Sequence, residues 1–172
     1  MENRMTTFSS ERGNTLIETV IALSVLLAVM GGLITISAVS STTTENNGHL
    51  AARTTEDAQD KMEQLLVLAY TNVTTDTTVF PAAAAGGTGL AIGGGLNTAA
   101  PVNGYVDWLA TDGTLLGGGA APPAGWFYER VWQVSAYSAN VKQITVLVTT
   151  KWAFNRARVP SSTVVALKAS QF

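Results

Sequence analysis

The chain has 172 residues, a formal net charge of −2 and no cysteine. This length allows one ordinary domain with an appendage, and the lack of cysteine excludes a disulfide framework, a thiolate metal site and a lipobox for lipid attachment. The ten Lys and Arg residues form no basic stripe, so nucleic acid is not an expected partner.

An uncharged apolar run covers residues 19–39. As a helix it would extend about 32 Å, enough for a hydrocarbon core of about 30 Å. Arg4 and Arg12 precede it and predict that the leader stays cytoplasmic while the remainder faces outward. Glu18 stands at the start of the run, and a charged side chain in a membrane segment is costly without a partner. An ordinary secretory signal has a shorter apolar region, of about 7 to 15 residues.

The stretch GNTLIE, residues 13–18, resembles the prepilin cleavage and methylation motif of type IV pilins and their relatives. The resemblance implies that a prepilin peptidase cuts on the cytoplasmic side, between Gly13 and Asn14, and N-methylates Asn14. It also implies that the apolar helix serves first as a membrane anchor and then as the fibre core. The family usually has Phe or another apolar residue at the position of Asn14.

Cleavage after Gly13 would place a cationic amine on Asn14, about one helical turn from Glu18. In the related pilins this glutamate is thought to pair with the amine of a neighbouring subunit. The pair docks the incoming subunit and fixes its axial register in the fibre. Loss of one member of a buried charge pair typically costs about 3 to 5 kcal/mol, so such a pair can select one register. The alternative is that the chain has an ordinary signal anchor, in which Glu18 lies at the level of the lipid headgroups and has no specific role.

After the apolar run the sequence turns polar but keeps a helical period. One face carries Ala51, Ala58, Met62, Leu65 and Ala69, which predicts core packing under a head rather than a binding surface for a separate helix. We expect one long helix with a weak point at residues 46–48. Two helices joined at Gly48 are the alternative.

Residues 71–125 contain 12 of the 16 glycines and favour loops and turns. Within them, residues 105–117 predict a hairpin that turns at Asp112-Gly113. In pilins the equivalent connection is the variable region exposed on the fibre. The glycine spacing from Gly87 lacks the Lys-Ser/Thr of a P-loop and the spacing of a dinucleotide fold, so we interpret it as a surface loop.

The last third of the chain is predicted to be β. Three segments rich in branched and aromatic residues, 125–138, 141–154 and 161–170, predict successive antiparallel strands that cover the amphipathic helix. The fold class is therefore α+β, with a long N-terminal helix packed against a small antiparallel C-terminal sheet. The strand order is similar to that of PilV-type minor pilins and of the I and J pseudopilins of type II secretion.

No catalytic constellation is visible, and we expect neither enzyme activity nor a cofactor nor a metal site. His49 has no cysteine or acid cluster near it and is predicted to be a solvated helix residue. Asp107 and Asp112 lack the pattern of a calcium loop and favour turn chemistry, although some pseudopilins bind calcium in this part of the head. The four tryptophans favour core or half-buried sheet positions. Residues 72–74 match a glycosylation sequon.

Together with these patterns, the resemblance to pilins implies a leader at 1–13, a transmembrane and fibre-core helix at 14–44 and a pilin-like head at 45–172. The head would consist of a loop region at 71–125 and a sheet at 126–172. The expected function is that of a fibre subunit, most like a minor pilin, held in the bacterial inner membrane with its N-terminus cytoplasmic before it joins a pilus or a periplasmic fibre. Expected partners are prepilin peptidase, other pilin or pseudopilin subunits, the inner-membrane assembly platform and the membrane. The alternatives are a type II secretion pseudopilin and a signal-anchored adhesion or binding protein that never polymerises.

Overall fold

The computed structural model describes residues 14–71, 90–152 and 159–170. Helix α1 runs from Asn14 to Val67 without interruption, so one long helix is correct and a break at Gly48 is not. Chain contacts divide the protein into two compact units, Met1–Thr44 and Glu45–Phe172. We refer to the described part of the second unit as the head.

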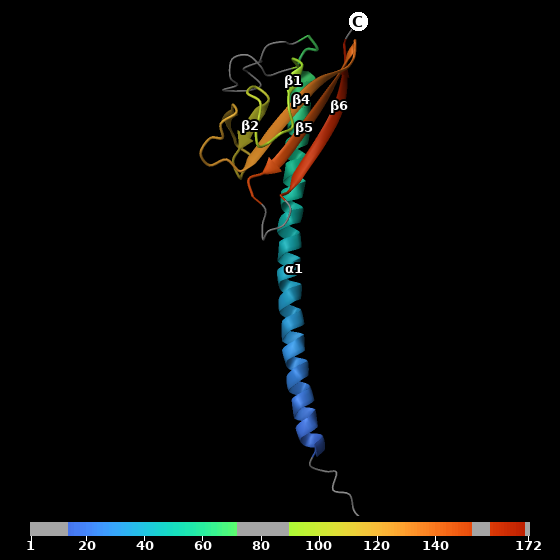
Figure 1. Cartoon of the computed structure of the whole chain (residues 1–172), viewed down its shortest axis with the longest axis vertical. Helices are drawn as coiled ribbons and strands as arrows, with labels where there is room; N and C mark the ends of the chain where they lie inside the picture. The colour runs from blue at the N-terminus through green and yellow to red at the C-terminus, as the bar shows by residue number, and fades with distance from the viewer. Residues whose placement is uncertain (1–13, 72–89, 153–158, 171–172) are drawn as a thin grey trace, which may run out of the picture. The chain divides into compact units, whose positions relative to one another are not determined.

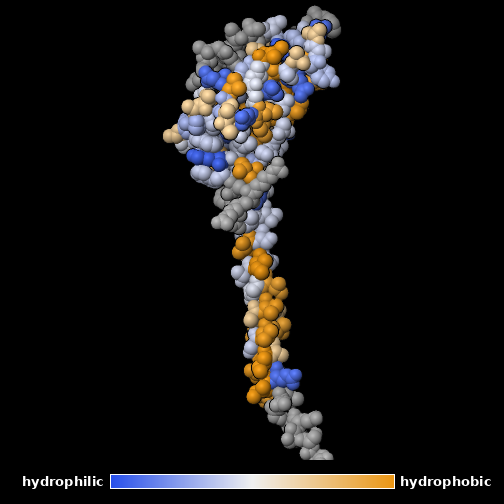
Figure 2. Space-filling view, viewed as in Figure 1, coloured by the Kyte–Doolittle hydropathy of each residue, from blue (hydrophilic) through white to orange (hydrophobic). Residues whose placement is uncertain are grey.

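The first unit presents an apolar helix surface. From Leu16 to Val39 the large hydrophobic side chains are all more than half exposed, and Figure 2 shows them as a hydrophobic stretch along the helix. By length and composition, α1 is the one helix in the described part of the chain that can cross a membrane. Its Ser and Thr hydroxyls donate to carbonyls of the preceding turn, as Ser24 does to Val20 and Thr35 to Gly31. These polar groups therefore need no partner outside the helix.

The head contains an antiparallel sheet of six strands. They are β1 (Gly93–Gly94), β2 (Val106–Leu109), β3 (Leu115–Gly118), β4 (Tyr128–Ser138), β5 (Val141–Thr150) and β6 (Ser161–Ala169). The spatial order is β3-β2-β4-β5-β6, and β1 pairs with β4 beyond the end of β2. Figure 1 shows β4, β5 and β6 side by side, with the second half of α1 along the same sheet.

The predicted strands and the predicted hairpin are confirmed. β4, β5 and β6 lie within the three segments expected to be β, and β2 and β3 form the hairpin that turns at Asp112-Gly113. Gly113 has φ +87°, a left-handed value that glycine adopts without steric cost. The Asp112 carboxylate accepts from the Thr114 N–H at 2.9 Å, which closes the turn.

The core lies between α1 and one face of the sheet. Three of the predicted helix residues, Ala58, Met62 and Leu65, are buried there against β4 and β5. Ala51 and Ala69 are exposed, so that part of the prediction was wrong. The helix ends at Val67, and residues adjacent to the predicted ones, Leu50 and Leu68, pack against the core instead.

The glycine-rich region is more than a surface loop. Residues 72–89 lie outside the described residues, but Gly93 and Gly94 form β1 and pair with Val134 and Gln133 of β4. A Cβ on Gly94, which has φ +78°, would lie 2.2 Å from the Trp132 carbonyl oxygen. These glycines therefore allow a close approach of backbone to backbone, which larger residues would prevent.

Candidate functional site

The predicted processing and assembly residues lie at the start of the chain. Gly13 is outside the described residues, and Asn14 is the first residue of α1. Glu18 lies four residues further on, on an exposed part of the helix. Within the described residues its carboxylate has no hydrogen-bond or ion-pair partner. Glu18 thus lies beside an exposed apolar surface, and the distance along the helix from Asn14 is about 6 Å.

The head contains a second charged site, which the sequence did not predict. Asp107 on β2 accepts from the Lys61 ammonium at 2.5 Å. It also accepts from Arg130 on β4, at 2.6 Å to Nε and 3.0 Å to Nη2. The other guanidinium nitrogen of Arg130 contacts the Asp60 carboxylate at 3.1 Å. We name Lys61, Asp107, Arg130 and Asp60 the ion cluster.

The position of the ion cluster follows from sheet register and helix period. Asp107 and Arg130 are directly opposite each other in the β2–β4 ladder, so both side chains lie on the same sheet face. Lys61 lies on the same helix face as Ala58 and Leu65. The Lys61 ammonium is also 4.1 Å from the centre of the Trp132 ring, a cation–π contact.

Burial controls the electrostatics of this cluster. Lys61 is fully buried, and burial lowers its pKa to about 8, although the Asp107 charge works in the opposite direction. The pKa of Asp107 is lowered: burial would raise it, and the Lys61 and Arg130 charges more than offset that effect. Each charge depends on its partners, because an unpaired charge in this position would cost several kcal/mol, on the order of 3 to 5. The cluster joins helix to sheet as a structural contact.

The same contacts show the roles of Asp107 and Asp112. Both carboxylate oxygens of Asp107 are bound by cationic side chains, while Asp112 lies in the hairpin turn. Turn chemistry is therefore confirmed for Asp112 and wrong for Asp107, a buried strand residue. Among the described residues no group of three or more metal-ligating side chains occurs. His49 is exposed, 3.9 Å from Glu45 one turn away, as expected for a solvated helix position.

The tryptophans divide between the two faces of the sheet. Trp132 is in the core, and Trp108 is buried on the opposite face, where its ring meets that of Trp126 at 4.7 Å. Trp152 is 55% exposed and lies just after β5, so it is about half-buried but is not a strand residue. The Lys151 ammonium lies 5.0 Å from both the Trp126 and the Trp152 ring centres. The face of the sheet that holds Trp108 also holds Glu129, whose Oε1 is buried without a hydrogen-bond partner. Burial raises the pKa of Glu129 to about 7.

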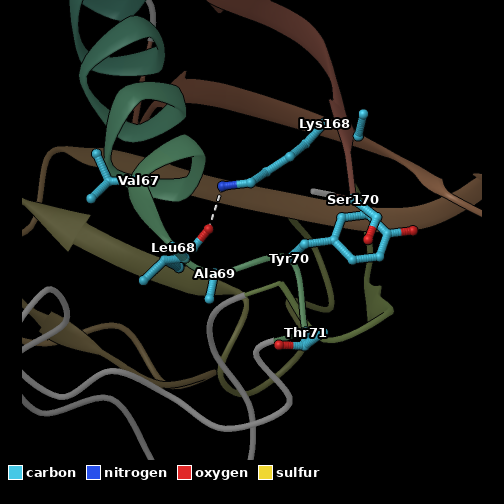
Figure 3. A pocket seen from close by; sticks show the side chains of 8 residues that line it. Val67, Leu68, Ala69, Tyr70, Thr71, Lys168 and Ser170 are labelled. Carbon is cyan, nitrogen blue, oxygen red and sulfur yellow. Dashed lines mark hydrogen bonds between the residues drawn. The ribbon is translucent and has the colours of Figure 1, made fainter. Parts of the chain in front are cut away.

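Two lysines of the sheet bind the C-terminal end of α1 and the residues that follow it. Lys168 of β6 donates to the carbonyl oxygens of Leu66 and Leu68, and Figure 3 shows the second of these bonds. Lys142 of β5 donates to the Tyr70 carbonyl at 2.6 Å. The last turn of the helix carries no basic residue of its own, so the sheet supplies the cations that a helix C-terminus favours. A cavity of about 390 Å³ lies beside this contact.

Comparison with known proteins adds no assignment: no protein-family model, no curated protein and no solved structure matches the chain. The sequon at residues 72–74 lies outside the described residues. The chain is defined by an apolar helix long enough to span a membrane and by an α+β head.

Proposed function

We propose that the chain is a structural subunit of a type IV pilus or a related fibre, most like a minor pilin. Prepilin peptidase cleaves the chain between Gly13 and Asn14. Before assembly, the subunit is anchored in the bacterial inner membrane with its N-terminus cytoplasmic. Other subunits and the inner-membrane assembly platform then take it into the fibre. Catalysis has no part in this function.

The observation that carries the proposal is the exposed apolar surface of α1 together with Glu18. A helix of this kind gains little hydrophobic energy on moving from a bilayer to an equally apolar fibre core, so packing and polar contacts must select its register. Glu18 lies beside that surface without a partner in the described residues. The amine of Asn14 on a neighbouring subunit, released by cleavage, is the partner that we propose.

The first experiment is the mass and N-terminal sequence of the protein expressed with and without a prepilin peptidase. We expect a mature chain that starts at Asn14 only when the peptidase is present, and an added methyl group would also identify the modification. A leader that remains intact in the presence of the peptidase would contradict the proposal. It would favour a signal-anchored binding protein.

The second experiment tests the role of Glu18. We expect Glu18→Ala to be cleaved normally yet to enter fibres poorly, because the incoming subunit loses its charge pair. Glu45→Ala is the matched control, since Glu45 is an exposed carboxylate on the same helix outside the apolar run. Incorporation is measured as the ratio of variant to wild-type chain in sheared fibres. Equal incorporation of Glu18→Ala and wild type would refute the pairing argument.

A further inference from the structure

β6 is the edge strand on one side of the sheet among the described residues. It pairs with β5 over all nine of its residues in continuous register, and no described strand lies along its other side. The opposite edge is β3, a strand of four residues that ends in two glycines. Natural proteins protect long edge strands with charges, prolines or bulges, because unpaired N–H and C=O groups are a template for another strand. β6 has no proline and no bulge within Ser161–Ala169.

The one charged residue of β6 does not protect this edge. The Lys168 ammonium is directed to the carbonyl oxygens at the C-terminal end of α1. Along the rest of the strand, Val165 and Leu167 are each 55% exposed on the outer face. Val164 and Ala166 on the inner face are only partly buried against the core. An added strand would therefore cover apolar side chains on both faces and pair with the backbone groups that point away from β5.

We propose that the occupant is β6 of a second copy of this chain, paired antiparallel about Val165. In this register Val165 faces its own copy, Val164 faces Ala166 and Thr163 faces Leu167. Ser162 faces Lys168, so no like charges are opposed. Parallel in-register pairing would instead place Lys168 beside Lys168, which is unfavourable. The sequence of β6 thus suits an interface with two-fold symmetry, in which the same surface is used by both partners.

The direction of β6 sets the orientation of the paired heads. The Ser162 hydroxyl lies 2.9 Å from that of Thr54, whereas Lys168 contacts Leu66 and Leu68, so β6 runs in the same direction as residues 45–67 of α1. A two-fold axis through Val165 therefore makes residues 45–67 of the two copies antiparallel. This contact is separate from the side-by-side helix packing of the proposed function.

The test uses single cysteines in the full chain in detergent, since the natural sequence has none. In the proposed register the two copies of residue 165 have Cα atoms about 4.5–5.5 Å apart, within the range of a disulfide. We expect Val165→Cys to form disulfide dimers on mild oxidation. Thr163→Cys alone should remain monomeric because its copies are separated by about 13 Å. A mixture of Thr163→Cys and Leu167→Cys should crosslink, and Leu116→Cys on β3 should not.

A second variant separates pairing from chance collision. Val165→Lys opposes two ammonium groups at the centre of the interface, and the exposed position lets the head keep its fold, which circular dichroism checks. We expect sedimentation to show dimers of the wild-type chain and monomers of Val165→Lys. Dimers that persist in Val165→Lys, or equal crosslinking of the 163 and 165 cysteines, would overturn the proposed register. Absence of wild-type dimers would overturn the pairing itself.

The Glu18→Ala variant separates this inference from the proposed function. Glu18→Ala should leave crosslinking at residue 165 unchanged, so the failure of this inference and the failure of the proposed fibre function are distinguishable.

Discussion

Asp107→Asn keeps the shape of the side chain but removes the negative charge that lies between two buried cations. The Lys61 side chain is 0% exposed and the Arg130 side chain is 4% exposed. Arg130 retains Asp60, whose side chain is 58% exposed and therefore screened by solvent. Lys61 loses its 2.5 Å partner. Because two buried cations then lack the charge of Asp107, we expect the free energy of unfolding of the head to fall by about 3 to 5 kcal/mol.

Lys61→Met is the matched control for this substitution. It removes the ammonium and leaves the two-bond contact between Arg130 and Asp107 in place. Replacing a buried charge by an apolar side chain of similar volume is often close to neutral, so we expect a loss below about 2 kcal/mol. In the Asp107→Asn background the same substitution should be stabilising, because it removes a buried cation that has lost the charge of Asp107. The sign of the Lys61→Met effect therefore depends on residue 107.

Urea unfolding of the full chain in detergent, followed by tryptophan fluorescence at pH 7 and pH 9, measures these differences. The pKa of Lys61 is about 8 in the folded head, below its usual value, so its titration makes folding more favourable as the pH rises above about 8. Without Asp107 that pKa falls further, and the cost of Asp107→Asn should shrink at pH 9. A cost below about 1 kcal/mol at pH 7, or an equal effect of Lys61→Met in both backgrounds, would refute the reasoning.

Three further outcomes test the head. The pKa of Glu129 is about 7 in the folded head, above its unfolded value, so its stabilising contribution is lost as the pH rises through 7. Glu129→Gln should therefore raise the free energy of unfolding at pH 8 by up to about 3 kcal/mol, and it should flatten the pH profile of thermal melts. Lys168→Met should accelerate amide hydrogen exchange in the last turn of α1, whereas Lys151→Met should not, because its ammonium contacts aromatic rings instead. Gly94→Ala should cost more than about 2 kcal/mol in urea unfolding, whereas Gly48→Ala, with no atom within 4 Å, should gain about 1 kcal/mol.

The elements that the sequence predicted are those with a local pattern. α1, the three C-terminal strands and the turn at Asp112-Gly113 each show a periodicity or a turn signal within a few residues. β1 was missed because two consecutive glycines are poor strand residues, and only the approach of Tyr105 and Trp132 explains them. The amphipathic face was only partly correct, because buried Thr54, Asp57 and Lys61 interrupt its apolar pattern.

The ion cluster could not be predicted for a different reason. Lys61 and Asp107 are 46 residues apart, and Asp107 and Arg130 are 23 apart. Such contacts depend on sheet register and on which helix face meets the sheet, and neither is encoded in spacing along the chain. Charged residues are usually exposed, so the residue types of Lys61 and Arg130 do not by themselves indicate a buried site. Glu18 stood out in the sequence because it borders an uncharged run.

The lysine contacts at the C-terminal end of α1 also set an order of events for the growing chain. Lys168 reaches a carbonyl 100 residues earlier, that of Leu68, and it lies on the last strand of the sheet. While the chain is still being made, the end of the helix lacks this cation and β5 lacks its outer neighbour. Contacts between distant residues form only after the loop between them closes. The head therefore completes its fold as a late and cooperative step, after its C-terminal strand has become available.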